Sequence, residues 1–178
     1  HLHYGVQGTG GIVLLTGDIG TGKTTISRRF LARAPTQCQV AYIFNPRLNV
    51  IELLLSICDE FGISTALDHD REPTVKALLD PLNAFLLAPR GAGRNPVLVI
   101  DEAQNCTYVQ LKMLLTRLGW HSTMVLTGDP DQSDLLEGMS GLADIARRLE
   151  PVEGIAVVRL AETDIVRHPL VASMLTVL

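Results

Sequence analysis

Hydrophobic positions along the chain fall into two kinds of segment that alternate. Five short runs are almost continuously apolar, a pattern typical of strands buried on both faces of a parallel sheet. These runs cover residues 11–17, 40–45, 97–101, 123–128 and 155–160. Segments with helical spacing of apolar residues lie at 23–33, 49–61, 73–88, 107–117 and 141–149. The alternation predicts an α/β fold, a three-layer α/β/α sandwich with a mainly parallel five-stranded sheet.

Polar segments rich in Gly, Pro and Asp mark the expected loops at residues 64–72, 88–96 and 128–134. Pro169 predicts the start of a short apolar helix near the end of the sequence. The chain has 178 residues, a length typical of one domain. We therefore expect residues 1–178 to form a single domain.

Composition restricts the class of protein further. The sequence is 47% hydrophobic but only 4% aromatic, which predicts an aliphatic core. The formal net charge of −4 argues against non-specific coating of nucleic acid, although a local basic groove is compatible with it. Cys38, Cys58 and Cys106 are far apart and form no CxxC pair, so neither a zinc site nor a disulfide framework is predicted.

No apolar run approaches the ~18 residues needed to cross a bilayer. The first ten residues, HLHYGVQGTG, lack the basic and apolar regions of a signal peptide. We therefore expect no membrane segment on this chain and a cytoplasmic location.

A glycine-rich loop follows the first predicted strand. GDIGTGKTT matches the phosphate-loop pattern GxxxxGK[ST] and stands between a strand and a helix, as that motif requires. Glycines let the backbone present N–H groups close to phosphates. Lys23 is expected to reach the β- and γ-phosphates, and the hydroxyl of Thr24 to bind Mg²⁺. The predicted nucleotide-binding residues are Gly17, Asp18, Ile19, Gly20, Thr21, Gly22, Lys23, Thr24 and Thr25.

Two adjacent acids end the third apolar run. In P-loop enzymes an acid at the place of Asp101 holds Mg²⁺, usually through water; the alternative is a helix-capping aspartate. Glu102 is expected to polarise the water that attacks the γ-phosphate; the alternative is a solvated acid in the first turn of a helix. The phosphate loop favours the catalytic interpretation of both acids.

The fourth run, TMVLTG, is the natural candidate for a strand between the phosphate-loop strand and the strand of Asp101. This arrangement is that of the additional-strand class of P-loop ATPases. Gln132 would then lie near the γ-phosphate and orient the attacking water, although it could also be an ordinary turn residue. Thr127 and Asp129 are weaker candidates for the same neighbourhood.

An arginine usually stabilises the charge on the transferred phosphoryl group, with a rate effect of about 10³–10⁵. Arg167, just before Pro169, is the first candidate for this role, in cis or in trans. Arg117, near the end of a helix, is the second. Either arginine could instead form a surface salt bridge.

Four stretches in the second half carry a family resemblance: DEAQNCTYVQLKMLLTRLG, MVLTGDPDQSDL, SGLADIARRL and ETDIVRHPLV. In order and approximate spacing they resemble PhoH-type ATPases, the phosphate-starvation-inducible family related to superfamily 1 helicases. The resemblance implies ATP hydrolysis, a link to RNA and assembly into rings.

The first half differs. HLHYGVQGTGGIVLLTGDIGTGKTTISRRFLAR, VAYIFNPRLNVIELLLSICDEFGI and VKALLDPLNAFLL resemble the AAA ATPase domain of ExeA/GspA-type secretion proteins. Those proteins act in assembly of a type II secretion system at the inner membrane. VLVIDEAQN is common to both resemblances, which meet near residues 97–105.

Both resemblances imply ATP and Mg²⁺ as ligands. The first hypothesis is a PhoH-like, Mg-dependent ATP hydrolase coupled to single-stranded RNA. A second is an AAA ATPase with a protein partner, at the cytoplasmic face of the inner membrane. A third is an ATP-binding module with little turnover. The Asp101–Glu102 pair and the lack of an arginine-rich lid disfavour a small P-loop kinase.

Overall fold

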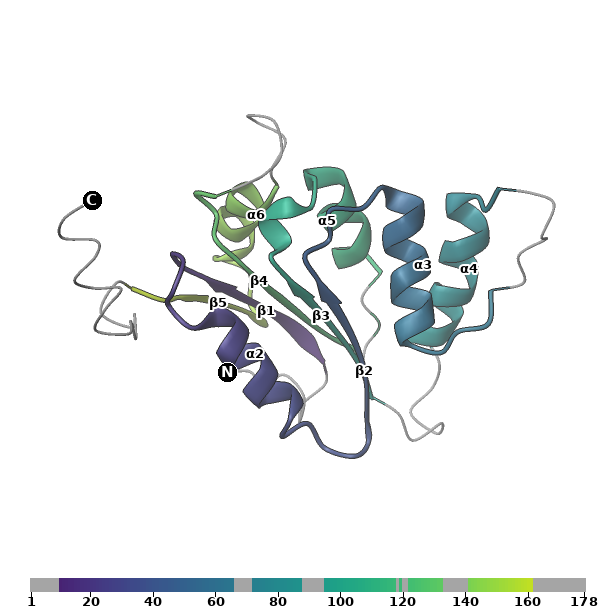
Figure 1. Cartoon of the computed structure of the whole chain (residues 1–178), viewed down its shortest axis with the longest axis horizontal. Helices are drawn as coiled ribbons and strands as arrows, with labels where there is room; N and C mark the ends of the chain where they lie inside the picture. Colours follow the sequence, from purple (N-terminus) through teal and green to yellow (C-terminus); the bar gives the residue numbers. More distant parts are fainter. Residues whose placement is uncertain are drawn as a thin grey trace.

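The computed structural model describes residues 10–65, 72–87, 95–117, 119, 122–132 and 141–161 (Figure 1). Every strand and helix predicted within these residues is present, with ends displaced by a few positions. The helix predicted after Pro169 lies outside the described residues. The elements are β1 (Gly11–Thr16), α2 (Lys23–Leu31), β2 (Cys38–Phe44), α3 (Val50–Glu60), α4 (Val75–Leu86), β3 (Asn95–Asp101), the 3₁₀ helix η2 (Ala103–Asn105), α5 (Tyr108–Leu115), β4 (Thr123–Gly128), α6 (Leu142–Leu149) and β5 (Ile155–Arg159).

The five strands form one parallel sheet in the order β2-β3-β4-β1-β5. Thr123, the first residue of β4, pairs with Gly11 of β1 on one side and with Val97 of β3 on the other. β4 therefore separates the strand that leads into the phosphate loop from the strand that ends at Asp101. This confirms the predicted fold, in which TMVLTG is the inserted strand of an additional-strand P-loop sheet.

The prediction of a loop through residue 96 is wrong, because β3 begins at Asn95. The N–H of Asn95 donates to the carbonyl of Gln37 at 2.9 Å. Pro96 pairs with Gln39 of β2, whereas pairing with β4 starts only at Val97. A proline is tolerated near the start of a strand, where the N–H that it lacks is not needed by a neighbour.

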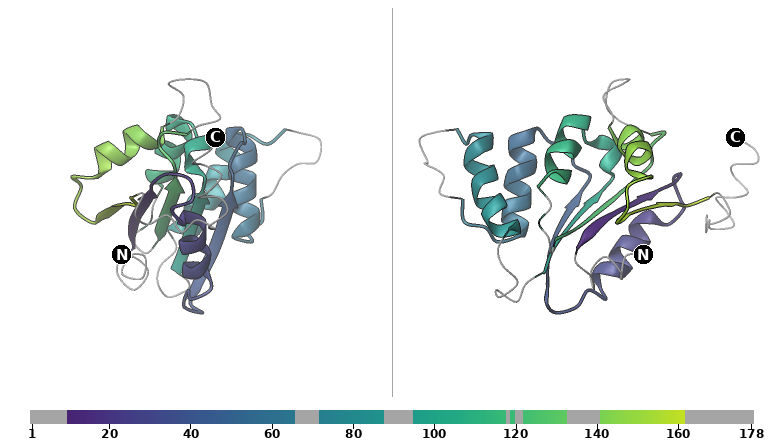
Figure 2. Two further views of the ribbon diagram at one scale, coloured as in Figure 1. Left: turned by 60° about the vertical axis from the view of Figure 1, so that its left-hand side comes forward. Right: turned by 180° about the vertical axis from the view of Figure 1, so that it is seen from behind.

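Alternate residues of the central strands divide the core between the two faces of the sheet. Helix α2 packs on one face, and α3, α5 and α6 lie over the other, with α4 against α3 (Figures 1 and 2). The α2 face is built from Val13, Phe30, Val97, Val99 and Val125, and the opposite face from Leu14, Leu98, Ile100, Met124 and Leu126. The structure is thus a three-layer sandwich, as predicted.

Replacing a core residue of α3 should destabilise the fold. Leu54 is fully buried, with 0% of its surface exposed. For Leu54→Ala we expect the free energy of unfolding to fall by about 2–5 kcal/mol, because a cavity remains where the side chain packed. Urea denaturation measures the change. Leu87→Ala, at a position 63% exposed, is the control and should change stability by less than ~0.5 kcal/mol.

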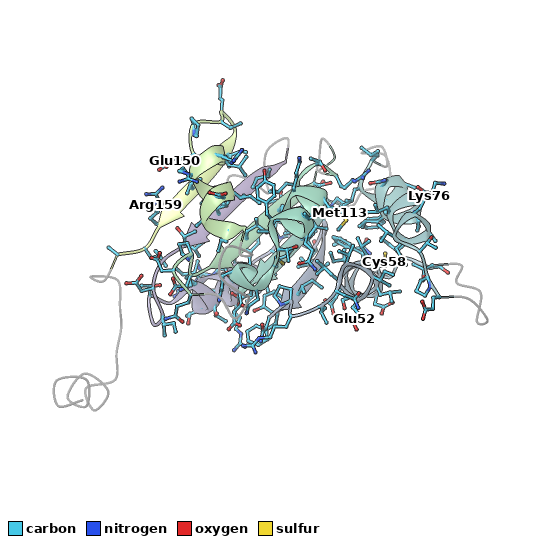
Figure 3. The ribbon with its side chains drawn as sticks, turned by 90° about the horizontal axis from the view of Figure 1, so that it is seen from above. Glu52, Cys58, Lys76, Met113, Glu150 and Arg159 are labelled. Atoms are coloured by element: carbon cyan, nitrogen blue, oxygen red, sulfur yellow. The ribbon has the colours of Figure 1, made fainter. Side chains whose placement is uncertain are left out.

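The three cysteines are free thiols, as the spacing predicts. Cys58 lies between α3 and α4, with its sulfur 3.9 Å from the carbonyl oxygen of Leu78 (Figure 3). Burial raises the pKa of Cys106 to about 12. Both thiols are packing residues rather than nucleophiles.

Within the described residues, no helix combines the length and apolar character required to cross a bilayer. Because the strands are parallel, the loops that follow β1, β3 and β4 lie at one edge of the sheet, where ligands of open α/β sheets bind.

Candidate active site

The phosphate loop, residues 17–22, connects β1 directly to α2. Gly22 precedes the helix in a left-handed conformation, with φ of 86°, and has no side chain to cap it. Gly17 passes so close to Leu160 that a Cβ atom on Gly17 would lie 2.8 Å from the Leu160 carbonyl oxygen. Within the loop, the hydroxyl of Thr21 donates to the carbonyl of Asp18 at 2.7 Å. These constraints explain why glycines are needed at both ends of the loop.

The first turn of α2 points N–H groups toward the loop. The earliest i to i−4 bond of the helix joins the N–H of Ile26 to the carbonyl of Gly22 at 2.9 Å. The N–H groups of residues 23–25 consequently have no acceptor within the helix. Since Gly22 provides no capping side chain, this turn fits a phosphate group, whose charge the helix dipole also favours.

Lys23 folds back over the loop that precedes it. Its ammonium nitrogen donates to the carbonyls of Gly17 at 2.5 Å and of Asp18 at 2.7 Å. Partial burial lowers the pKa of Lys23, and nearby carboxylates oppose this shift, led by that of Asp129. The ammonium is thus held at the mouth of the loop and surrounded by negative charge.

Asp101, which is 1% exposed, ends β3, and both oxygens of its carboxylate accept hydrogen bonds. One oxygen accepts the hydroxyl of Tyr42 at 2.7 Å. The other accepts the N–H of Glu102 at 3.2 Å and the hydroxyl of Thr127. Three of the roughly four acceptor positions of a carboxylate are therefore occupied by the protein. These bonds fix the orientation of Asp101.

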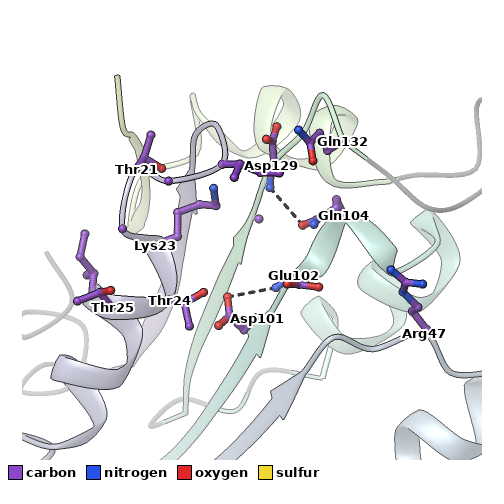
Figure 4. A pocket seen from close by; sticks show the side chains of 15 residues that line it. Thr21, Lys23, Thr24, Thr25, Arg47, Asp101, Glu102, Gln104, Asp129 and Gln132 are labelled. Atoms are coloured by element: carbon purple, nitrogen blue, oxygen red, sulfur yellow. Dashed lines mark hydrogen bonds between the residues drawn. The ribbon is translucent and has the colours of Figure 1, made fainter. Parts of the chain in front are cut away.

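Glu102 adopts a left-handed backbone conformation, with φ of 57°. A non-glycine residue in this region costs free energy and is concentrated at functional sites. Glu102 precedes η2, so it does not occupy the first turn of an α-helix, which was the alternative to a catalytic role. Its half-buried side chain lines the same cavity as Thr24 and Asp101 (Figure 4).

The end of β4 is fitted closely to the segment that follows β3. The N–H of Asp129 donates to the side-chain carbonyl of Gln104 at 3.2 Å. A Cβ atom on Gly128 would lie 2.5 Å from that same oxygen, which explains the glycine. The N–H of Gln132 donates to the carbonyl of Asp129 at 3.2 Å, in a turn that carries Gln132 back to the site.

These segments surround a cavity of about 1010 Å³ (Figure 4). It brings together most of the predicted site residues, including both acids and Gln132. Gly17 and Asp18 meet the site through Lys23. The lining residues are Ile19, Gly20, Thr21, Gly22, Lys23, Thr24, Thr25, Ile26, Arg47, Asp101, Glu102, Gln104, Gly128, Asp129 and Gln132.

The structure does not bring Arg117 to this cavity. Arg117 follows α5, close to Gly119 and Ser122, and the carbonyl of Ser122 pairs with the first residue of β1. It thus lies toward the amino edge of the sheet, opposite the phosphate loop, and its buried Nε has no hydrogen-bond partner among the residues that the structure describes. At this position Arg117 does not line the cavity of its own subunit. Arg167 lies outside the described residues.

Three residues of the site, Tyr42, Arg47 and Gln104, were missed by the sequence analysis. Tyr42 and Arg47 flank the carboxyl end of β2, which β3 and β4 separate from β1. Their place at the carboxyl end of a predicted strand was the available signal. Gln104 belongs to the segment DEAQN, where the two acids alone were assigned roles.

The oxygen ligands of this site fit Mg²⁺. The hydroxyl of Thr24 and the carboxylate of Asp101 face one another across the base of the cavity (Figure 4). Hard oxygen ligands next to a phosphate site suit Mg²⁺, which retains several of its waters. Because Asp101 is already hydrogen-bonded at both oxygens, contact through metal-bound water fits better than direct ligation.

Tyr42 should affect the response to Mg²⁺ through Asp101. For Tyr42→Phe we expect the Mg²⁺ concentration that gives half-maximal ATP turnover to rise about tenfold, because Asp101 loses an orienting bond. Titration of turnover with MgCl₂ at fixed ATP measures this shift. Tyr108→Phe, on α5 away from the cavity, is the matched control. An unchanged Mg²⁺ titration for Tyr42→Phe would show that Thr127 and the backbone are sufficient to hold Asp101.

Two protein families match the chain. The family described as AAA ATPase domain matches residues 1–127, and the family described as PhoH-like protein matches residues 88–178. The two matches overlap in the segment that contains β3, Asp101 and Glu102. The change of resemblance predicted near residues 97–105 falls inside this overlap.

Curated relatives represent both families. General secretion pathway protein A of Aeromonas hydrophila is 43% identical over 76% of this chain and 25% of its own length. Protein PhoH of Escherichia coli is 47% identical over 89% of this chain and 50% of its own length. A PhoH-like protein of Synechocystis is 34% identical over 90% of this chain and 54% of its own length. The chain thus spans between a quarter and about half of these relatives.

Solved structures support the fold. Cdc6p from Pyrobaculum aerophilum superposes with a TM-score of 0.61 at 20% identity, over 84% of this chain and 38% of that one. Drosophila ORC bound to DNA gives a TM-score of 0.56 at 19% identity, over 88% of this chain and 39% of that one. Together with the two family matches, these similarities identify the chain as a P-loop ATPase domain that belongs to both the AAA ATPase domain family and the PhoH-like family.

Proposed function

We propose that this chain binds ATP with Mg²⁺ and hydrolyses the γ-phosphate, and that residues 1–178 act as one domain in doing so. One observation supports this most directly. A single cavity is lined by residues from two segments far apart in sequence: Lys23 and Thr24 at the start of α2, and Asp101 and Glu102 at the end of β3. A phosphate-binding cation, two groups that would hold Mg²⁺ and a base then lie where one phosphoryl group could meet all of them.

Each residue has a separate role in the proposed hydrolysis. Lys23 and the first turn of α2 bind the β- and γ-phosphates, while Thr24 and Asp101 hold Mg²⁺, which supplies neutralising charge to the phosphate oxygens. Glu102 accepts a proton from water as the water oxygen attacks the γ-phosphorus. The bond from that phosphorus to the bridging oxygen breaks, and ADP and phosphate result. Gln132 orients the attacking water.

The proposed coupling is PhoH-like, with single-stranded RNA as the partner. The PhoH-like relatives align with about nine-tenths of the chain, and therefore with residues well before the PhoH-like match at 88–178. Self-association into a ring would allow Arg167 of one subunit to complete the site of the next. Arg167 remains our candidate for this charge-stabilising role.

A second function is favoured by the relative from Aeromonas. That protein is named for a general secretion pathway and is 43% identical over three-quarters of this chain. Under this reading the ATPase would drive assembly of secretion machinery, and its partner would be a protein. The active site would be the same, so only the response to partners separates the two functions.

Phosphate release from Mg-ATP, with and without single-stranded RNA, tests the proposed coupling. RNA-stimulated release would support the PhoH-like function. Release that RNA does not change would favour the protein-coupled alternative. Tight ATP binding without release would reduce the domain to a nucleotide-binding module and reject hydrolysis.

A further inference from the structure

The cavity is lined by a second cationic side chain, besides Lys23, to which the proposed mechanism gives no role. Its described lining includes five ionic side chains, of which three are the acids Asp101, Glu102 and Asp129. Lys23 and Arg47 supply the positive charge. A triphosphate adds further negative charge to these three acids. Mg²⁺ and Lys23 would offset part of this charge, and a second cationic side chain would add to that compensation.

The loop that carries Arg47 is anchored to the catalytic segment. It begins at Asn45, whose N–H donates to the carbonyl of Asp101 at 3.2 Å. The side chain of Asn45 accepts the amide of Asn105 at 2.9 Å and the Nε of Arg47 at 3.3 Å. Asn45 adopts a left-handed conformation, with φ of 50°, as Glu102 does. The backbone of Arg47 is thus positioned by the residues on either side of Glu102.

The other end of this loop is fixed as well. The amide of Gln110 donates to the carbonyl of Leu48 at 2.8 Å. Asn49 then caps α3 through a reciprocal pair of bonds with Glu52, both at 2.9 Å. These bonds fix the backbone on both sides of Arg47, whose exposed side chain lines the cavity.

Glu102 lies between Lys23 and Arg47 in the view of Figure 4. All three residues line the same cavity, so a phosphoryl group bound at Lys23, with its attacking water at Glu102, would share that cavity with Arg47. The bond from Arg47 to Asn45 engages the Nε of the guanidinium.

We propose that Arg47 is a catalytic residue that acts in cis, donating hydrogen bonds to the γ-phosphoryl group of ATP and stabilising its charge during transfer. This inference rests on the proposed hydrolysis. It gives the site an arginine from the same subunit, whereas Arg167 would supply a second one. If Arg47 contacts the γ-phosphoryl group, its loss should weaken the binding of ATP more than that of ADP. The loss of a purely structural residue would not have this selective effect.

The test compares nucleotide affinities. Fluorescent forms of ADP and of the β,γ-imido analogue of ATP are titrated, with Mg²⁺, into the wild-type chain, Arg47→Ala and Arg47→Lys. Arg33→Ala is the matched control, since Arg33 is exposed at the far end of α2 and away from the cavity. For Arg47→Ala we expect about tenfold weaker binding of the ATP analogue, with ADP affinity within about twofold of wild type. Arg47→Lys should fall between the two, because it retains charge but loses the planar fork.

Two results would overturn the proposal: equal weakening of ADP and the ATP analogue, or no change in either. Retained ADP binding also shows that the variant is folded. Because the imido analogue is not hydrolysed, the outcome is independent of turnover. A wild-type chain that fails to release phosphate, yet loses affinity for the ATP analogue alone upon Arg47→Ala, would reject the proposed hydrolysis and retain the Arg47 contact.

Discussion

Replacing Glu102 with glutamine should abolish most hydrolysis while leaving ATP bound. We expect phosphate release by Glu102→Gln to fall by about 10²–10⁴, the usual contribution of a positioned general base. The amide has nearly the same shape, so the cavity and the bond from the Glu102 N–H to Asp101 should persist. Steady-state phosphate release, beside a nucleotide-binding titration, measures both properties.

Glu153→Gln is the matched control, because Glu153 is an exposed acid in the turn before β5. It should release phosphate at the wild-type rate. If Glu102→Gln also retained more than about a tenth of that rate, Glu102 would not be the base. Its left-handed conformation would then need another explanation.

Lys23→Ala should weaken the binding of Mg-ATP, the step that precedes hydrolysis. The ammonium of Lys23 already bonds two loop carbonyls, and with ATP it would exchange these bonds for phosphate oxygens. Losing this cation should weaken Mg-ATP binding by at least about 100-fold, because charge-assisted bonds in a partly buried site are strong. Isothermal titration with Mg-ATP checks the change in Kd.

Lys112→Ala, at an exposed position on α5, should bind Mg-ATP like the wild type. A small effect of Lys23→Ala would mean that the N–H groups of α2 alone hold the triphosphate. Comparison with Glu102→Gln separates binding from chemistry, since only Lys23→Ala should affect the Kd strongly.

The sheet could be predicted because each of its strands has a recognisable local sequence pattern. VLVID and TMVLTG are continuous apolar runs, and both β3 and β4 are buried almost throughout. The insertion of β4 next to β1 followed from the phosphate loop and the paired acids together. The start of β3 was missed because Asn95 and Pro96 resemble a turn in sequence, whereas their place in the sheet is set by β2 alone.

Site residues that belong to a sequence motif could be predicted. Site residues that the fold brings to the cavity from distant parts of the sequence could not. Lys23, Thr24, Asp101 and Glu102 belong to contiguous patterns. Arg47 is more than 20 residues beyond the phosphate loop and more than 50 before Glu102, and only the pairing of β2 with β3 brings it to the cavity. No local pattern encodes that proximity.

Arg117 shows the converse limitation. Its position near a helix end made it the second candidate for the charge-stabilising arginine, but α5 starts at the carboxyl edge of the sheet and runs toward the amino edge. The direction of the helix therefore carries Arg117 away from the phosphate loop. A sequence pattern predicts where a helix ends. It does not predict at which edge of the sheet that end lies.

The most direct test of the central claim is phosphate release by the wild-type chain from ATP with Mg²⁺, compared with ATP and excess EDTA. We expect release in Mg²⁺ that stops when the metal is chelated, since Thr24 and Asp101, which line the cavity together, would hold the metal. Bound ATP with no phosphate release in Mg²⁺ would contradict the assignment of this site as an ATP hydrolase.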